Sequence, residues 1–513
     1  MSSQSTSSLD RLSAAMDRFS VALQRRFEID LRALAAFRIA LGLLIILDLL
    51  NRTRDFHDFH TDAGILPVKA LYSDYSDVYS LHALSGEAWV QALLFLIAGA
   101  FALAMVLGYR TRFVTIVSWL LLMSLHIRNP MVLNGGDALL RLLVFWGIFL
   151  PLGERWSIDA RGVDRPRSTV ASEATMAVLL QVFLMYATNA IHKYRSDTWM
   201  DGEAVLYIFQ ADHLTILLGN VLADQFMLLR VFTYAWLVCI FASPLLLILT
   251  GYPRAALATA FAGMHVGMFL TLRIDLFPLI SLAGLVLFYP PVVWDKVADL
   301  ADRFGVASPM RTRLEWLQRT TSELPSPSVS SPSIPKVVTL GRGVFISVVP
   351  AVFLFLILFS NAAAVDYTEV PEPGEEILDT TKTDQSWRMF APEPTSNARW
   401  LVAPGELENG SEVDALNGGE VTWDKPPSVE RTYESSRWRK YLLNMRYASN
   451  ENHRSYSANY LCERWNAEHE TELETVTIYG LTDLAEPYDD EQDIARFKLI
   501  EYDCSGDFVQ ESA

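Results

Sequence analysis

The feature that most constrains the fold is a run of nineteen uncharged residues from Ala174 to His192, which ends at Lys193. Such a run is typical of a helix that crosses a membrane, because about 20 apolar residues span the hydrocarbon core. Lysine is scarce here, with 8 Lys against 34 Arg, and no other predicted span carries one. An ammonium at the end of a span must reach the interface, pair with another group or take part in chemistry.

The rest of the chain repeats this apolar pattern. Hydrophobic residues make up 51% of the 513 residues and the mean hydropathy is +0.21, which is too apolar for a soluble protein. We therefore predict an all-α polytopic membrane domain of about nine transmembrane helices. The predicted spans lie at 33–50, 87–107, 112–127, 136–152, 172–192, 229–250, 255–273, 275–293 and 343–363.

Charge divides the chain into two parts. Residues 365–513 hold 32 acidic and 13 basic residues, a net charge of −19, whereas residues 1–364 sum to +2. Such an acidic part repels nucleic acid, so DNA and RNA are excluded as partners. An acidic surface with few lysines is also halophile-like, that is, typical of proteins that work in very salty surroundings. Strand-like segments at 400–402, 420–423 and 475–479, with a helix-like one at 457–470, predict a small α+β tail domain.

The remaining boundaries follow from composition. Residues 1–32 mix charged and apolar residues at helical spacing, which predicts a cytoplasmic amphipathic segment at the membrane surface. The next part, 33–293, is predicted to hold eight spans. Residues 294–342 contain a Ser/Pro-rich stretch and are predicted as a cytoplasmic linker before the ninth span at 343–363.

The distribution of basic residues predicts the orientation. With the N-terminus in the cytoplasm, the inner segments hold 19 Lys/Arg and the outer segments before the tail hold 8. An odd number of spans then places the tail outside the cell, so the protein is expected to be a multi-pass protein of the cell membrane. There Cys462 and Cys504 either form a disulfide or stay free thiols. The histidines and cysteines lack metal-ligand spacing, so no metal is expected.

Three charged residues and two histidines in the predicted spans are candidates for chemistry or binding. Arg38 marks a partner or a substrate path in the first span or, alternatively, snorkels to the inner surface. Asp137 and Arg141 are four residues apart on one helix face, as a structural ion pair or as groups that bind substrate or cofactor. His126 and His265 each lie in an apolar helix, either as satisfied core residues or as catalytic groups.

Asn189 and Lys193 are also four residues apart and share a helix face. In a water-poor cavity the neutral amine of a lysine is favoured over the ammonium, so such a lysine can act as a base near neutral pH. Alternatively, Lys193 anchors the helix at the membrane surface beside Tyr194, Arg195 and Trp199, a common interfacial composition. Residue types alone leave both roles open.

A set of short motifs follows one another along the chain. They are Phe37-Arg-Ile with Gly42, Thr61-Asp-Ala-Gly64, Arg128-Asn-Pro130 with Gly136-Asp137, Lys193 to Trp199 followed by Gly202, His265 with Phe277-Pro278, and Trp387-Arg-Met-Phe-Ala-Pro392. In this order they resemble the HTTM (horizontally transferred transmembrane) family, whose domain is related to vitamin K-dependent gamma-carboxylase. The last motif is similar to the outer domain of microbial members.

The resemblance implies an activity. In the carboxylase, a lysine just before a tryptophan is the proposed base that deprotonates reduced vitamin K, whose anion reacts with oxygen. The strong base so formed removes a proton from glutamate, and carbon dioxide adds. Lys193 is the matching position, although His192 precedes it where the carboxylase has a second lysine.

The resemblance thus implies a carboxylase-like lyase or ligase with a reduced, vitamin K-type quinone as cofactor and Lys193 as base. The expected cavity is lined by Lys193, Asn189, Arg38, Asp137, His126 and His265. The alternative is a non-enzymatic membrane protein that binds a lipid, peptide or protein partner through its tail, with Lys193 only an anchor. The lipid bilayer is a partner in both cases.

Overall fold

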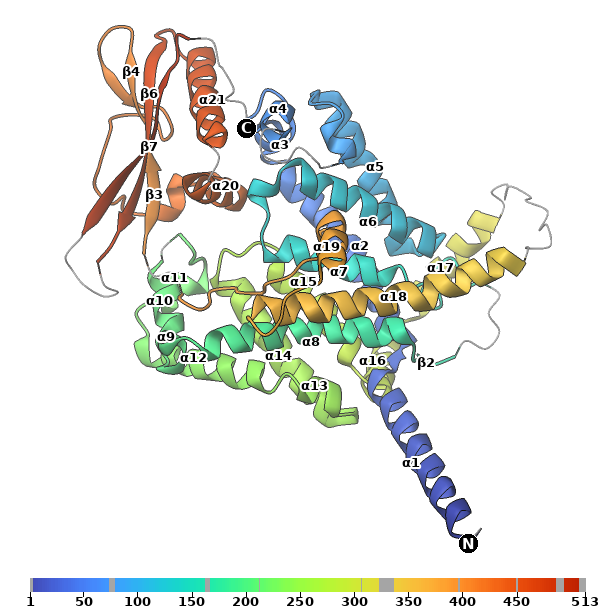
Figure 1. Ribbon diagram of the computed structural model, residues 1–513. Helices are drawn as coiled ribbons and strands as arrows, with labels where there is room; N and C mark the ends of the chain where they lie inside the picture. The colour runs from blue at the N-terminus through green and yellow to red at the C-terminus, as the bar shows by residue number, and fades with distance from the viewer. Residues whose placement is uncertain are drawn as a thin grey trace.

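The computed structural model describes residues 3–72, 79–161, 167–211, 213–305, 307–322, 336–394, 397–448, 451–485 and 493–506. The Ser/Pro-rich stretch at 323–335 lies outside these residues. Figure 1 shows a bundle of helices with the C-terminal sheet beyond one end, while α1 and α17 extend from the opposite end.

Helices dominate the first 322 residues. They are α1 Ser3–Phe27, α2 Leu31–Arg52, α3 Phe56–His60, α4 Val68–Tyr72, η1 Leu81–Ala83, α5 Ala88–Leu107, α6 Thr111–Arg128, η2 Pro130–Val132, α7 Gly135–Gly147, α8 Glu173–Tyr194, α9 Asp197–Met200, α10 Ala204–Gln210, α11 Leu218–Leu222, α12 Phe226–Phe241, α13 Leu245–Ile248, α14 Gly251–Thr271, α15 Phe277–Leu285, η3 Val286–Phe288, α16 Pro291–Arg303 and α17 Ala307–Ser322. Two short strands, β1 Ile29–Asp30 and β2 Thr169–Val170, pair antiparallel at the start of α2.

Four helices in the described residues are long and apolar enough to cross a membrane: α2, α5, α8 and residues Phe345–Ala364 of α18. A fifth is possible if η3 and α15 count with α16 as one span, although the pair is bent by 106°. The structure also places helices at the other predicted spans, but several are short: the 13 residues of α7 reach only about 20 Å, against a hydrocarbon core of about 30 Å.

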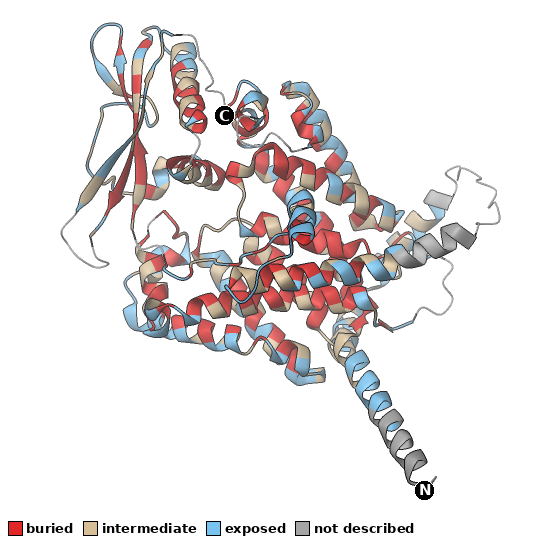
Figure 2. Cartoon of the chain, in the orientation of Figure 1, coloured by how far each residue is buried: buried red, intermediate tan, exposed pale blue. Residues whose placement is uncertain are grey.

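The centre of the bundle is the pair α8 and α18 Lys336–Ala364, which lie side by side in Figure 1. The N-cap of α8 is Ser172, whose side chain accepts a hydrogen bond from the amide of Thr175 and whose own amide donates one to the threonine hydroxyl oxygen. This reciprocal cap satisfies two of the free N–H groups of the first turn. Figure 2 shows α7 and α8 mostly buried, whereas the described part of α1 is mostly exposed.

The tail domain, residues 365–513, is α+β. Its elements are α19 Glu372–Thr381, β3 Arg399–Val402, β4 Pro404–Leu407, β5 Glu412–Asp414, η4 Val429–Thr432, α20 Ser436–Tyr447, α21 Asn452–Glu468, β6 Leu473–Asp483 and β7 Ile494–Asp503. These strands form one antiparallel sheet around β6, which pairs with β3, β4 and β7. A disulfide joins Cys462 on α21 to Cys504 just after β7.

One predicted strand in the tail is wrong. Residues 420–423 lie outside the strands, and Val421 and Trp423 instead pack from the side against the buried core of the domain. An apolar–polar alternation indicates a half-buried face, but a strand also needs a neighbour for its backbone hydrogen bonds. The predicted strands near 400 and 475 and the predicted helix near 457 are present as β3, β6 and α21.

Candidate functional site

A cavity of about 620 Å³ lies where the membrane helices meet the tail domain. Its walls come from α8, α10, α12 and α14 on one side and from α20 on the other. Most of the lining is apolar, with Phe209, Trp236 and Met268 among the larger side chains. Cavities of this size and character are the usual sites for small apolar ligands.

Lys193 lines this cavity near the C-terminal end of α8 and is only 2% exposed. Its Nζ donates a hydrogen bond to the carbonyl oxygen of Met389 (3.2 Å) and lies 3.3 Å from the centroid of the Trp199 ring. In the described part of the chain, no carboxylate lies within ion-pair distance of Lys193. The side chain is therefore an unpaired buried amine and not a snorkelling surface anchor.

Asn189, one turn before Lys193, holds the chain segment that reaches the site from α18. Its Nδ2 donates to the carbonyl oxygens of Trp387 (3.0 Å), Arg388 (3.0 Å) and Met389 (3.4 Å). Three carbonyls can converge on one amide because Trp387, Met389 and Phe390 all have positive φ angles. Non-glycine residues rarely adopt such angles, and they persist only where the surroundings enforce them.

The same segment, which we call the connector (residues 383–392), is anchored deep in the bundle. Gln385 exchanges hydrogen bonds with Gln181 of α8 at 2.7 and 3.0 Å and accepts one from Asn361 of α18 at 3.2 Å. The indole of Trp387 donates to Gln385 (2.7 Å), and that of Trp199 donates to the Phe390 carbonyl (2.8 Å). The connector is thus one wall of the cavity.

His265 also lines the cavity, as the sequence predicted for it. Its Nε2 lies 2.8 Å from the hydroxyl oxygen of Tyr186, which is on α8 four residues before Ala190 and likewise lines the cavity. The Nδ1 atom of His265 is buried without a hydrogen-bond partner in the described part of the chain. The pair therefore presents one satisfied and one free polar group to the cavity.

Arg38 was expected to line the cavity, and it does not belong to the described lining. It is fully buried and donates to the carbonyl oxygens of Leu152, Arg155, Val106 and Trp156, at 2.6 to 3.3 Å. Carbonyls at helix ends lack intrahelical donors, and a guanidinium with five N–H groups can satisfy several of them. Arg38 is therefore a structural group and does not snorkel either.

Asp137, Arg141 and His126 also lie outside the cavity lining, and the expected pairing of Asp137 with Arg141 is wrong. The guanidinium of Arg141 instead contacts Nδ1 of His126 (3.0 Å) and the carbonyl of Lys382 (3.0 Å). Asp137 accepts the amide hydrogen of Asn134 at the start of α7, and its other oxygen meets arginines from elsewhere. A spacing of four residues allows an ion pair, but both groups contact other partners instead.

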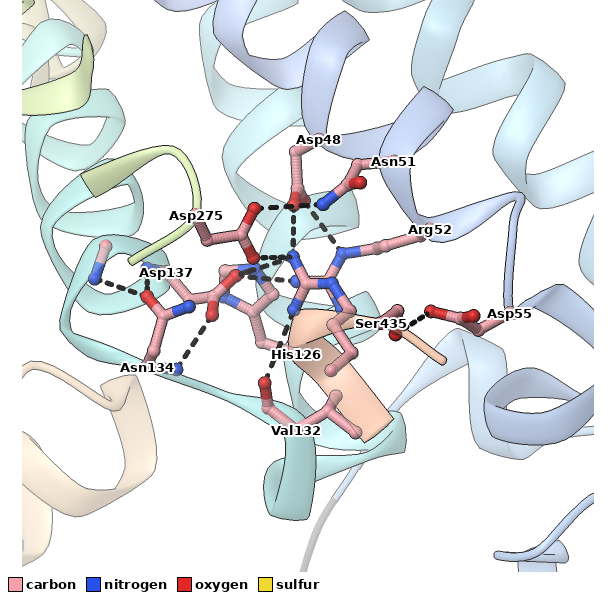
Figure 3. A network of polar contacts seen from close by, with 12 residues as sticks. Asp48, Asn51, Arg52, Asp55, His126, Val132, Asn134, Asp137, Asp275 and Ser435 are labelled. Atoms are coloured by element: carbon pink, nitrogen blue, oxygen red, sulfur yellow. Dashed lines mark hydrogen bonds and ion pairs between the residues drawn. The ribbon is translucent and has the colours of Figure 1, made fainter. Parts of the chain in front are cut away.

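Asp137 and the arginines that contact it belong to a buried cluster, shown from close by in Figure 3. Asp48 and Asp137 each contact Arg52, at 2.8 and 2.7 Å, and each contacts Arg437 of the tail domain, at 2.6 and 3.4 Å. Asp275 completes the cluster at 3.7 Å from Arg437. Arg437 thus carries a charge of the tail domain into the membrane domain.

The cluster does not fit a metal ion. Ligand atoms of Asp48, His126 and Asp137 lie within 4.8 Å of one another, which is close enough to share a cation. The carboxylates, however, already face the guanidinium groups of Arg52 and Arg437. A divalent cation between two guanidinium groups would be repelled by both.

Sequence reasoning missed several residues that build the site. One signal was available: Asp48 and Arg52 are charged residues four apart at the end of an apolar run, which is a rare and costly arrangement. Arg437 gave none, because a charged residue in an acidic soluble-type domain is ordinary. The other missed residues are Tyr186, Trp199, His213, Asp275, Arg399, Arg439 and Lys440.

Fold and site together define a multi-pass helical membrane protein with a small α+β domain closing one end of an internal cavity. Residues 27–294 match the HTTM domain, so the chain belongs to the HTTM-domain family. It is also similar to the sporulation-delaying protein SdpB of Bacillus subtilis (strain 168), with 24% identity over 149 residues. That match covers 26% of this chain and 44% of SdpB. No solved structure matches the chain.

Proposed function

We propose that this protein is a membrane enzyme in which Lys193 acts as a base on a reduced quinone bound in the cavity. The observation that carries the proposal is a lysine that is buried, lacks a carboxylate partner and lines an apolar cavity. An unpaired ammonium in such a place is costly, so the neutral amine, which can accept a proton, is favoured. Membership of the HTTM-domain family adds weight to this assignment.

The residues present fit a quinone-type cofactor. Aromatic and methionine side chains of α10, α12 and α14 would hold an isoprenoid chain, and Trp199 and Tyr186 offer flat ring surfaces. A reduced quinone bound there would supply an ionisable ring hydroxyl and two reducing electrons. The Nδ2 atom of Asn189 is engaged by the connector, so this residue positions one wall of the cavity.

The surroundings of Lys193 suit proton transfer at its Nζ atom. When the neutral amine accepts a proton, the ammonium that forms stays within hydrogen-bond distance of the Met389 carbonyl and over the face of Trp199. Both contacts stabilise positive charge, the second through the quadrupole of the indole ring. These contacts reduce the cost of the ammonium that forms when the neutral amine of Lys193 accepts a proton.

The test uses the full-length protein in nanodiscs with reduced vitamin K-type quinone, bicarbonate and oxygen. Quinone epoxide, measured by mass spectrometry, is expected from the wild type and should fall at least 100-fold in Lys193→Ala, the effect typical of removing a general base. Lys69→Ala is the matched control, because that lysine is exposed and does not line the cavity. No epoxide from the wild type, or equal turnover by Lys193→Ala, would contradict the proposal.

A second candidate function is favoured by the contacts of the connector. Lys193, Asn189 and Trp199 all bind backbone carbonyls of residues 387–390, so they also fasten the tail domain to the bundle. In this reading the protein is not an enzyme, and the acidic tail binds a lipid, peptide or protein partner. The two candidates differ in one result. If the protein is an enzyme, the wild type turns over quinone and Lys193→Met loses this turnover while the tail stays attached; if it is not, neither protein shows turnover.

We also propose the full topology of nine spans, with the N-terminus in the cytoplasm and the tail domain outside the cell. The excess of basic residues in the inner segments supports it, as does the arrangement in which α1 and α17 extend from the end opposite the sheet. Protease added to intact cells should remove the tail, and Cys462 and Cys504 should react with a thiol label only after reduction. A protected tail would contradict this orientation.

A further inference from the structure

Charge around the cavity is unbalanced. Its described lining holds three cations, Arg399, Arg439 and Lys440, besides the amine of Lys193, against a single carboxylate, that of Asp275. That carboxylate is already engaged, because it accepts a hydrogen bond from Asn51 (2.9 Å) and lies 3.7 Å from Arg437. Half-buried positive charge without a counter-ion is costly, so an anion that enters this space is stabilised.

All three cations come from the tail domain, which is otherwise strongly acidic with its net charge of −19. The helix α20, which lies between the sheet and the bundle in Figure 1, carries four basic residues and no acidic one. Arg437 enters the buried cluster, and Arg446 binds the Leu481 carbonyl and the Thr482 hydroxyl. Arg439 and Lys440 remain to face the cavity.

These cavity-facing cations lack counter-ions. Arg439 donates through Nη2 to the carbonyl of Arg273 (3.0 Å), and its buried Nε has no hydrogen-bond partner. The Nε of Arg399 is likewise buried and without a partner. Among the described residues, no carboxylate lies within ion-pair distance of Arg399, Arg439 or Lys440. Burial lowers the pKa of Arg439 to about 10 and also lowers the pKa of Lys440, which expresses the cost of these charges.

The remainder of the cavity is apolar. Away from α20 it is lined by side chains such as Phe209, Phe232 and Trp236, together with Met264 and Met268, whose flexible thioethers adapt to chains of varied shape. A ligand that satisfies both regions must have a charged end and a hydrocarbon end. Free phosphate would meet only the first requirement, and a neutral lipid only the second.

We propose that the cavity binds an anionic amphiphile, whose carboxylate or phosphate head group lies against Arg399, Arg439 and Lys440 and whose apolar chain lies along α12 and α14. This site goes beyond the base chemistry of Lys193 and does not depend on it. The head group offers the free N–H donors of two arginines the charge-assisted hydrogen bonds that they lack in the chain itself. It also offsets the excess positive charge of the lining.

Tryptophan quenching tests the proposal directly, because Trp199 and Trp236 line the cavity. The full-length protein in neutral detergent is titrated with a brominated long-chain fatty acid and with the methyl ester of the same acid. We expect the acid to quench and to bind at least 10-fold tighter than the ester, since one charge-assisted hydrogen bond contributes roughly that factor. A second arm compares brominated phosphatidylglycerol and phosphatidylcholine in nanodiscs, and a third uses inorganic phosphate as a competitor.

Variants identify the site. Lys440→Gln should weaken binding of the acid about 10-fold and leave the ester unchanged, whereas Lys440→Arg should keep wild-type affinity. Lys498→Gln, which removes an exposed lysine of the same domain outside the cavity lining, is the matched control. A preference for either the fatty acid or phosphatidylglycerol supports the site and shows which kind of anionic amphiphile binds there. Equal binding of acid and ester together with no preference for phosphatidylglycerol, or insensitivity to Lys440→Gln, would overturn it.

A failure here is distinguishable from a failure of the quinone proposal. Lys193→Ala should abolish quinone turnover yet retain preferential binding of the charged amphiphile, because Arg399, Arg439 and Lys440 remain. Lys440→Gln should do the reverse. If Lys193→Ala alone removed the preference for the acid over its ester, the anion would bind at Lys193 and not at α20, and the proposal would fail.

Discussion

Two groups of charges meet at α20, and they differ in how they are neutralised. In the cluster around Asp137, the guanidinium groups of Arg52 and Arg437 face carboxylates at 2.6 to 3.4 Å. In the cavity, no carboxylate of the described residues lies within ion-pair distance of Lys193 or of the half-buried Lys440. Buried charges that are fully paired hold structure together, whereas buried charges that lack partners cost free energy and are retained where a ligand or a reaction uses them.

The largest expected effect comes from breaking the paired group. Arg437→Met removes the cation that Asp48, Asp137 and Asp275 share, and stranded buried carboxylates cost about 3–5 kcal/mol. We expect a marked fall in the unfolding temperature and release of the tail domain to protease. Arg464→Met is the control, because its ion pair with Glu434 is largely exposed and contributes at most about 1 kcal/mol. Equal losses in the two variants would refute the structural role of the cluster.

A smaller effect is expected at the connector. Asn189→Ala leaves the carbonyls of residues 387–389 without their common donor, at a cost of about 1–3 kcal/mol for buried unsatisfied groups. Hydrogen exchange in peptides covering the connector should speed up, while exchange in β6 should stay unchanged. An unchanged exchange rate would show that the contacts of Gln385, Lys193 and Trp199 hold the connector without Asn189.

Loss of Lys193 should change stability less still. Lys193→Met strands no carboxylate, fills a similar volume and leaves the Met389 carbonyl with Asn189 as donor, so the free energy of unfolding should change by less than about 1.5 kcal/mol. Thermal unfolding of this variant beside Arg437→Met makes the comparison in one experiment. A loss as large as that of Arg437→Met would mean that Lys193 is a structural residue like the cluster.

The smallest effect, and one of opposite sign, is expected at Asp275. Burial raises the pKa of Asp275 above its usual 3.8, so the folded state binds this proton more tightly than the unfolded state. The wild type therefore loses stability as the pH rises from about 4 through that raised pKa, and Asp275→Asn avoids this loss. The variant should be equal to or slightly more stable than the wild type at pH 8, by up to about 1 kcal/mol. Asp48→Asn, which leaves two arginines underpaired, should be less stable.

The sequence was informative wherever the relevant groups belong to one element. Apolar runs located α2, α5, α8 and α18, and a spacing of four residues correctly placed Asn189 and Lys193 on one face toward one cavity. The same rule failed for Asp137 and Arg141, because spacing within a helix shows which groups can meet but not which distant groups compete for them.

The rest of the site depends on contacts between distant parts of the chain. Arg437 lies 300 residues from Asp137, and the connector lies about 200 residues from Asn189, so no local pattern links them. Arg38 illustrates the same limit: a charge in an apolar run correctly indicated a costly group, but its partners are carbonyls more than 60 residues away. Hydrogen bonds to backbone carbonyls cannot be predicted from residue types, because every residue has a carbonyl.

The connector limits how this architecture can be truncated or transferred to another protein. The region that matches the HTTM domain ends at residue 294, whereas the carbonyl that holds Lys193 belongs to Met389. A chain made of the matched region alone would keep the lysine and lose the wall that encloses it. In this protein the module that defines the family is therefore not self-sufficient, and transplanting it without residues 383–392 would leave the cavity open on one side.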